Sequence, residues 1–213
     1  MDNPARRAIF GHMEHDADIL IVGGGLNGPA LGVALAQGGL RVAVIDARPA
    51  PARAETGFDG RAYALAIASK RLLQVTGVWA RLGDAVQPIL KVKASDGRAG
   101  QGPAPFFLTF DAADLEEGPM GFMVEDRHLY AAFLAAMADT PGLTLLSGET
   151  VVAQEVSAQG VTVTLASGRT LRGRVLVGCD GRTSGVASRA GVRRQGGGYG
   201  QTALVTAVHH AEN

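Results

Sequence analysis

The sequence has one cysteine, no long apolar run and no excess of charge of either sign, and each shortage excludes a class of protein. The single cysteine, Cys179, rules out an internal disulfide and a Cys-x-x-Cys redox pair, which suits a reducing cytoplasm. Lysine plus arginine and aspartate plus glutamate both number 20, so the basic excess typical of nucleic-acid binding is missing. No apolar run approaches the roughly 20 residues of a membrane-spanning helix.

Two further shortages concern targeting and metals. The segment Met1–Asp16 is polar and lacks the apolar core of a secretory signal, so we interpret residues 1–16 as a flexible arm and expect a cytoplasmic protein. None of the five histidines has an Asp, Glu or Cys partner at metal-ligand spacing, so we expect no metal site.

Glycine, by contrast, is abundant, and its placement predicts a nucleotide-binding unit. Thirty glycines and 46% apolar residues indicate a globular chain with many tight turns. An apolar strand at 18–22 runs into a glycine turn, a helix is predicted at 27–37, and a second buried strand at 41–45. Strand, turn, helix and strand in this order form a βαβ unit with a parallel strand pair.

The glycine turn has the spacing of a dinucleotide-binding fingerprint, Gly23-x-Gly25-x-x-Gly28. In such a turn the first glycine permits the bend, the second lets the backbone approach a pyrophosphate, and the third lets helix pack on strand. The helix N-terminus offers free N–H groups to the phosphates. Asp46, at the end of the second strand, is placed to accept hydrogen bonds from the adenosine ribose. We assign cofactor binding here to Gly23, Gly25, Leu26, Asn27, Gly28, Asp46, Ala47 and Arg48.

The fingerprint alone does not distinguish FAD from NAD, but two features favour FAD. A second glycine–acid site, Gly178-Cys179-Asp180-Gly181, follows another apolar strand about 150 residues downstream, where a second contact to one cofactor is plausible. The chain also lacks a Tyr-x-x-x-Lys pair, which removes one large class of nicotinamide dehydrogenases.

The rest of the chain alternates between helical and strand patterns. We predict helices at 69–73 and 126–138, the latter with an apolar stripe of Leu129, Phe133 and Met137, and strands at 89–94 and 106–110. Period-two patterns predict an antiparallel meander of strands at 143–146, 151–156 and 161–165. Buried and alternating strands follow at 174–177 and 201–208. The fold class is therefore α/β: a Rossmann-like FAD/NAD(P)-binding domain with a βαβ unit and an antiparallel β-meander.

Taken together, five blocks resemble the FAD-dependent aromatic hydroxylases, a family of flavoprotein monooxygenases, and in particular their ubiquinone-biosynthesis branch. The likeness runs from about Asp18 to the C-terminus. The blocks are the glycine fingerprint and residues 59–65, 124–129, 178–184 and 199–203.

The resemblance implies roles for further residues. Arg61 and Arg127 look like the arginines that steady the FAD pyrophosphate and ribityl chain, and guanidinium groups pair well with phosphate oxygens. Asp180 and Gly181 match the family's Asp-Gly motif, near the pyrophosphate and implicated in NAD(P)H use. The chain departs from the pattern at Asp46, where glutamate is commoner, and at Ala187, where the motif usually closes with an arginine. We name no catalytic residue, because in this family the cofactor supplies the chemistry.

The implied activity is hydroxylation of an electron-rich phenol with FAD, NAD(P)H as electron donor and O₂. In the ubiquinone branch the substrate is a phenolic polyprenyl compound. Relatives are about twice this long, so the chain resembles only their N-terminal half. The resemblance therefore implies part of a β-rich substrate domain beside the FAD-binding domain. We predict an arm at 1–16, parts of the FAD-binding domain at 17–84 and 116–192, and parts of the substrate domain at 85–115 and 193–213.

Alternatives stay open at this point. The chain could be a non-catalytic FAD- or nucleotide-binding fragment, or belong to an FAD hydroxylase or epoxidase acting on another substrate. Peripheral association of the full-length protein with the inner membrane and assembly into a homo-oligomer also stay open.

Overall fold

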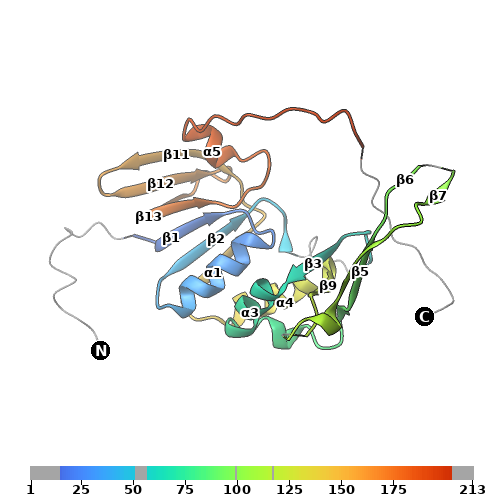
Figure 1. The fold of residues 1–213 in the computed structure, drawn as a ribbon. Coiled ribbons are helices and arrows are strands. Elements are labelled where there is room, and N and C mark those ends of the chain that lie inside the picture. Colours follow the sequence, from blue (N-terminus) through green and yellow to red (C-terminus); the bar gives the residue numbers. More distant parts are fainter. Residues whose placement is uncertain (1–14, 51–56, 99, 117, 203–213) are drawn as a thin grey trace. The chain divides into compact units, whose positions relative to one another are not determined.

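A computed structural model describes residues 15–50, 57–98, 100–116 and 118–202 (Figure 1). The described chain divides into two compact units, one made of residues 15–50 and 133–202 and the other of residues 57–132. Helix α4 (Asp126–Asp139) contains the boundary between them. The predicted domain boundaries, which assign residues by their role in cofactor or substrate binding, stay a prediction.

The first unit is built on a six-stranded sheet in the order β10-β2-β1-β13-β12-β11. Its first four strands run parallel, and the last three form an antiparallel meander in which β13 belongs to both parts. The strands are β1 (Ala17–Val22), β2 (Val42–Asp46), β10 (Leu143–Ser147), β11 (Val151–Ser157), β12 (Gly160–Leu165) and β13 (Thr170–Gly178).

Helices α1 (Asn27–Gln37) and α5 (Gly185–Arg189) complete this unit. Gly32 lets α1 lie close to the sheet, because a Cβ there would be 3.0 Å from a methyl group of Val44 and 3.3 Å from one of Leu143. A buried core joins the parallel and meander parts of the sheet and includes Leu20, Val22, Ile45, Val163 and Leu171. The βαβ unit predicted from the sequence is confirmed, and so is the antiparallel pairing of the two predicted meander strands 151–156 and 161–165.

The second unit has a three-stranded antiparallel sheet in the order β3-β9-β4 and a two-stranded ribbon, β5–β8. Its strands are β3 (Ala62–Ala66), β4 (Val86–Ile89), β5 (Lys91–Ala94), β8 (Leu108–Asp111) and β9 (Gly121–Glu125), with a short pair β6 (Gly97–Arg98) and β7 (Gly102–Pro103). Helix α3 (Ile67–Val75) and the 3₁₀ turns Trp79–Arg81 and Ala112–Asp114 connect them. In α4 the predicted stripe of Leu129, Phe133 and Met137 is buried.

Three sequence expectations need correction. The strand predicted at 89–94 is two strands in different sheets, because the chain leaves β4 at Ile89 and starts β5 at Lys91. The segment 143–146 was expected in the meander, but β10 pairs parallel with β2 at the opposite edge of the sheet. Strands β3 and β9 were not predicted at all.

The remaining expectations concern the chain ends and the membrane. Of the strand predicted at 201–208, residues 201 and 202 are not in a strand, and residues 203–208 lie outside the described residues, as do residues 1–14 of the predicted arm. Within the described ranges, no helix combines the length and the apolar character that crossing a bilayer requires.

Candidate functional site

The glycine turn joins β1 to α1 at the carboxyl end of the parallel strands. Gly23 has φ +112°, a conformation that favours glycine, and a Cβ there would lie 2.2 Å from the carbonyl oxygen of Cys179. A Cβ on Gly28 would lie 1.9 Å from the carbonyl oxygen of Gly23. Both glycines are therefore required by the protein's own backbone.

Gly25 is different, because a Cβ there would meet no protein atom within 4 Å. Gly25, Leu26 and Asn27 lead into the first turn of α1, where backbone N–H groups have no partner within the helix. An open glycine beside a helix N-terminus is the arrangement that lets a phosphate group approach the backbone. The residues present thus fit the pyrophosphate of a dinucleotide.

Asp46 closes β2 beside this turn. The residue is 3% exposed, and Oδ1 of its side chain accepts a hydrogen bond of 3.2 Å from the backbone N–H of Arg48. Gly24 lies directly against the carboxylate, since a Cβ there would be 2.5 Å from Oδ2 of Asp46. Ala47 and Arg48 follow on the surface. Gly24 is one of the variable positions of the fingerprint, yet its small size makes room for the acid.

The second glycine–acid loop lies against the first turn. The N–H of Cys179 donates to the carbonyl of Val22 at 2.6 Å, and β13 pairs with β1 up to Gly178. Gly181 has φ +82° and lies in the same loop. The structure thus brings Gly23, Gly25, Leu26, Asn27, Gly28, Asp46 and the loop of Asp180 and Gly181 to one end of one sheet. Ligands of open α/β sheets bind at this end of the strands.

The carboxylate of Asp180 is engaged with α5. It accepts hydrogen bonds from the hydroxyl of Ser184 and from the backbone N–H of Val186, the latter at 3.1 Å. Burial alone would raise the pKa of Asp180, but these hydrogen bonds outweigh it, and the pKa lies below its ordinary value. Asp180 thus holds the start of α5 in place as an anion, and its contact with a cofactor stays a prediction.

Cys179 directly precedes Asp180, and Arg189 is the last residue of α5. Burial, with a smaller effect of the adjacent Asp180, raises the pKa of Cys179, which keeps its thiol protonated and unreactive at neutral pH. Arg189, two places beyond the position where the family motif usually has arginine, donates from Nε to the side-chain oxygen of Gln154 at 3.2 Å.

Arg61 and Arg127 lie in the second unit, where the pairing of Ala62 with Glu125 brings their chain segments together. Arg61 directly precedes β3 and Arg127 is the second residue of α4. The Nε of Arg127 is 2.6 Å from Oε2 of Glu125, and its guanidinium carbon lies 5.9 Å from the centre of the Phe58 ring.

Arg61 contacts two carboxylates. Its Nη2 is 2.6 Å from Oδ2 of Asp59 and 2.9 Å from Oδ2 of Asp126. Asp126 in turn accepts a hydrogen bond of 2.9 Å from the hydroxyl of Tyr63 on Oδ1. Burial, and then this hydrogen bond, raise the pKa of Tyr63. Asp59, Tyr63 and Asp126 were not predicted as site residues, although all three lie in blocks that carry the family resemblance.

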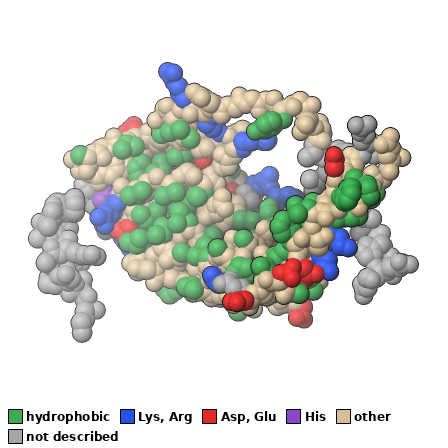
Figure 2. Space-filling model, viewed as in Figure 1, with side chains coloured by type: hydrophobic (Ala, Val, Ile, Leu, Met, Phe, Trp, Pro, Cys, Tyr) green, Lys and Arg blue, Asp and Glu red, His purple; other side chains and the backbone are tan. Residues whose placement is uncertain are grey.

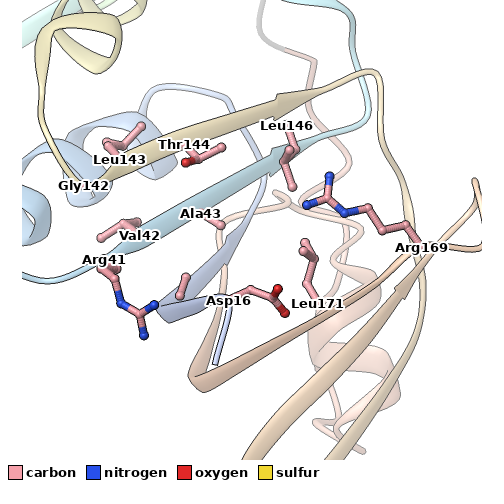
Figure 3. A pocket seen from close by; sticks show the side chains of 11 residues that line it. Asp16, Arg41, Val42, Ala43, Gly142, Leu143, Thr144, Leu146, Arg169 and Leu171 are labelled. Atoms are coloured by element: carbon pink, nitrogen blue, oxygen red, sulfur yellow. The ribbon is translucent and has the colours of Figure 1, made fainter. Parts of the chain in front are cut away.

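A pocket of about 250 Å³ lies at the opposite end of the parallel strands (Figure 3). Asp16, Ala17, Val42, Ala43 and Leu143 place it at the amino ends of β1, β2 and β10, and Arg41 and Arg169 reach toward it from two sides. None of the predicted cofactor residues lines it. Among the described residues, no cluster of His, Cys, Asp or Glu has the geometry of a metal site.

Comparison with known proteins agrees with the geometry of the first unit. Residues 16–212 match the family model described as FAD binding domain. Ubiquinone hydroxylase UbiL of Rhodospirillum rubrum is 43% identical over 202 residues, which are 95% of this chain and 46% of that protein. The 3-demethoxyubiquinol 3-hydroxylase of Escherichia coli is 33% identical over 197 residues, 90% of this chain and 48% of that protein. The chain therefore spans about half the length of these relatives.

Solved structures show the same fold. The complex of aklavinone-11 hydroxylase with FAD and aklavinone superposes with a TM-score of 0.67 at 24% identity, covering 84% of this chain and 36% of that one. The p-nitrophenol 4-monooxygenase PnpA of Pseudomonas putida gives a TM-score of 0.67 at 18% identity, covering 82% and 43%. At these identities the likeness concerns the fold alone, which is the Rossmann-like fold predicted from the sequence.

Proposed function

Because this chain belongs to the FAD binding domain family, we propose that it is the cofactor-binding part of a monooxygenase that hydroxylates a polyprenylated phenol in ubiquinone biosynthesis. The observation that carries the proposal is the meeting of the glycine turn, Asp46 and the Asp180–Gly181 loop at one end of the sheet. The proposed substrate class comes from the names of two relatives, a ubiquinone hydroxylase that is 43% identical and a 3-demethoxyubiquinol 3-hydroxylase that is 33% identical. NAD(P)H is the proposed electron donor.

The described residues have binding and orienting roles in this proposal. Backbone N–H groups at Leu26 and Asn27 face the pyrophosphate, the carboxylate of Asp46 accepts from the ribose hydroxyls, and Ala47 and Arg48 flank the adenosine. Arg61 and Arg127 pair with anionic oxygens of the cofactor. When bound, FAD accepts electrons from NAD(P)H and passes them to O₂ for hydroxylation.

A pair of glycine substitutions tests the proposal. Gly25→Val should abolish FAD binding while leaving the fold intact, because its side chain enters open space where the pyrophosphate is proposed to lie. Fluorescence titration of FAD measures binding, and circular dichroism measures folding. Gly28→Ala is the control for loss through misfolding, since its Cβ would collide with the backbone of Gly23. A Gly25→Val protein that binds FAD as well as the wild type would contradict the assignment.

A non-catalytic FAD-binding role is the competing function, because the family model that the chain matches describes an FAD binding domain and no reaction. The absorption spectrum and NAD(P)H oxidation distinguish the two. A yellow protein that NAD(P)H does not bleach under nitrogen would favour the non-catalytic role, whereas bleaching would support an oxidoreductase.

A further inference from the structure

Arg61 is the described residue whose observed contacts conflict most directly with its proposed role. Besides the two contacts of Nη2, its Nε donates to Oδ2 of Asp59 at 2.7 Å and its backbone N–H donates to Oδ1 of the same residue at 3.0 Å. One guanidinium thus faces two carboxylates. A group with this surplus of negative charge around it attracts a phosphate poorly, so withdrawal of one acid would strengthen the attraction of Arg61 for an anionic oxygen.

The two acids differ in how firmly they are held. Asp126 has a side chain that is 17% exposed, accepts from Tyr63 on Oδ1, and its backbone N–H donates to the carbonyl of Arg61 at 3.0 Å. It is also the first residue of α4, so its backbone is part of a 14-residue helix. Withdrawal of the Asp126 carboxylate from Arg61 would therefore also break its hydrogen bond with Tyr63 and has little freedom to occur, because the backbone of Asp126 is fixed.

Asp59 has none of these restraints. Its side chain is 50% exposed, it lies in the loop before β3, and Arg61 is its partner in each of the contacts described above. The hydrogen bond from Arg61 lowers the pKa of Asp59, so its carboxylate is ionised at neutral pH. The Asp59 carboxylate can therefore turn away from Arg61 and lose only solvent-exposed contacts, which contribute little free energy.

We propose that Asp59 is a displaceable competitor of the cofactor for Arg61, and that Asp126, held by Tyr63, is a positioning residue that keeps Arg61 in place before and after the exchange. The inference rests on the proposed function, in which Arg61 pairs with an anionic oxygen of FAD. Every contact that it uses lies within the second unit.

The test compares FAD dissociation constants of the wild-type chain and of single variants by fluorescence titration. Asp59→Asn should tighten binding by about two- to fivefold, in keeping with the weakness of exposed ion pairs. The gain should shrink at high salt, where exposed charges are screened. Asp126→Asn should weaken binding, because Arg61 loses its fixed partner and must be ordered when FAD binds.

Two controls separate displacement from a general effect of charge. Asp84→Asn removes an exposed carboxylate of the same unit that has no contact with Arg61, and it should leave the affinity unchanged. In an Arg61→Ala background, Asp59→Asn should have no effect, because the competition needs both partners. Circular dichroism of each variant checks that the fold is kept.

The outcomes separate the competitor role of Asp59 from the proposed function. If FAD binds and Asp59→Asn leaves the affinity unchanged, the competitor role is overturned while the proposed function stands. The same conclusion follows if Asp126→Asn tightens FAD binding as much as Asp59→Asn does. If neither the wild type nor any variant binds FAD, alone or coexpressed with the downstream segment of a relative, the proposed function fails, and the inference fails with it.

Discussion

At the scale of single residues, the glycines of one motif serve different ends. Gly23 and Gly28 are required by close backbone contacts within the protein, and Gly24 makes room for the Asp46 carboxylate. Gly25 has open space around it, and in the proposed function a phosphate of the cofactor occupies that space. Glycine therefore serves packing within the protein at three positions of this turn, and we propose that it serves ligand binding at the fourth, Gly25.

Gly24 and Asp46 should act as one unit. Asp46→Ala should weaken FAD binding by about 1–3 kcal/mol through the lost hydrogen bonds to a charged acceptor. Gly24→Ala should also weaken it, because the new Cβ displaces the carboxylate that lies 2.5 Å away. Combining both changes should cost clearly less than the sum of the two, since contacting residues are not additive. Titration of FAD into the three variants measures this. Additive losses would show that Gly24 acts independently of Asp46, and an unchanged affinity in Asp46→Ala would assign that residue a structural role in the turn, where it contacts Arg48.

At the scale of elements, the second unit shows how tertiary pairing overrides local pattern. β3 has the sequence AYALA, in which alanine is a poor strand former, yet it pairs antiparallel with β9 along its whole length. The predicted strand 89–94 is interrupted at Leu90, where the chain passes from one sheet to another. Both features depend on partners distant in the sequence.

Helix α5 carries a prediction for its own stability. Ser184 caps it, with its hydroxyl oxygen accepting from the N–H of Ala187 at 3.0 Å, and its hydroxyl donates to Asp180. Ser184→Ala should cost about 1 kcal/mol at neutral pH, measured by thermal unfolding. Ser188→Ala, an exposed change on the same helix, is the matched control.

The pH dependence of the same helix follows from Asp180. Its pKa in the folded protein is below the ordinary value, so its contribution to stability is present above the ordinary pKa of aspartate and is lost as the pH falls through the folded pKa. Ser184→Ala removes one of the hydrogen bonds that lower this pKa, and should raise it. Carboxyl-carbon NMR of Asp180 measures the shift. An unchanged pKa in Ser184→Ala would mean that the backbone N–H groups alone hold the anion.

At the scale of the whole chain, each unit has apolar side chains that no other described residues bury. Cross-strand partners share a face, and in the ribbon β5–β8 one face consists of Val92, Ala94, Leu108 and Phe110. Three of these side chains are 41–60% exposed, and hydrophobic side chains gather there in Figure 2. The other face carries the ion pair of Lys91 and Asp111, at 2.7 Å. An isolated two-stranded ribbon of this kind is marginally stable in water.

The first unit has a comparable open edge. β12 pairs with β13 only as far as Gly173, so from Val175 to Gly178 no described strand pairs with the edge of β13 that faces away from β1. Val175 is 49% exposed. Open edges with apolar side chains favour association with further strands.

We therefore predict that the 213 residues alone bind FAD weakly and do not hydroxylate a phenol. The relatives are about twice as long, and the open edge and ribbon face are where additional chain would find partners. FAD titration and NAD(P)H oxidation with and without a phenolic substrate check this, with hydrogen peroxide as the expected product of any oxidation.

Tight stoichiometric FAD binding together with coupled hydroxylation would show that the chain is self-sufficient. Coexpression with a downstream segment from a relative should improve flavin binding.

The sequence by itself determined the features that depend on neighbouring residues. The bounds of α1, the glycine turn, the acid at the end of β2 and the family resemblance all follow from short spacings, because glycine conformation and helix periodicity are local properties. The buried stripe of α4 follows for the same reason.

Only the tertiary structure decided what depends on distant partners. It placed β10 in the parallel sheet, where pairing with β2 satisfies the backbone hydrogen bonds at the edge of β2. The period-two pattern of residues 143–146 does not identify the partner strand. It turned Asp180 toward α5, and it joined Tyr63 to Asp126 across 63 positions of sequence, so that Arg61 lies between two acids. Hydrogen bonds and charges act across space, and spacing along the chain does not contain that information.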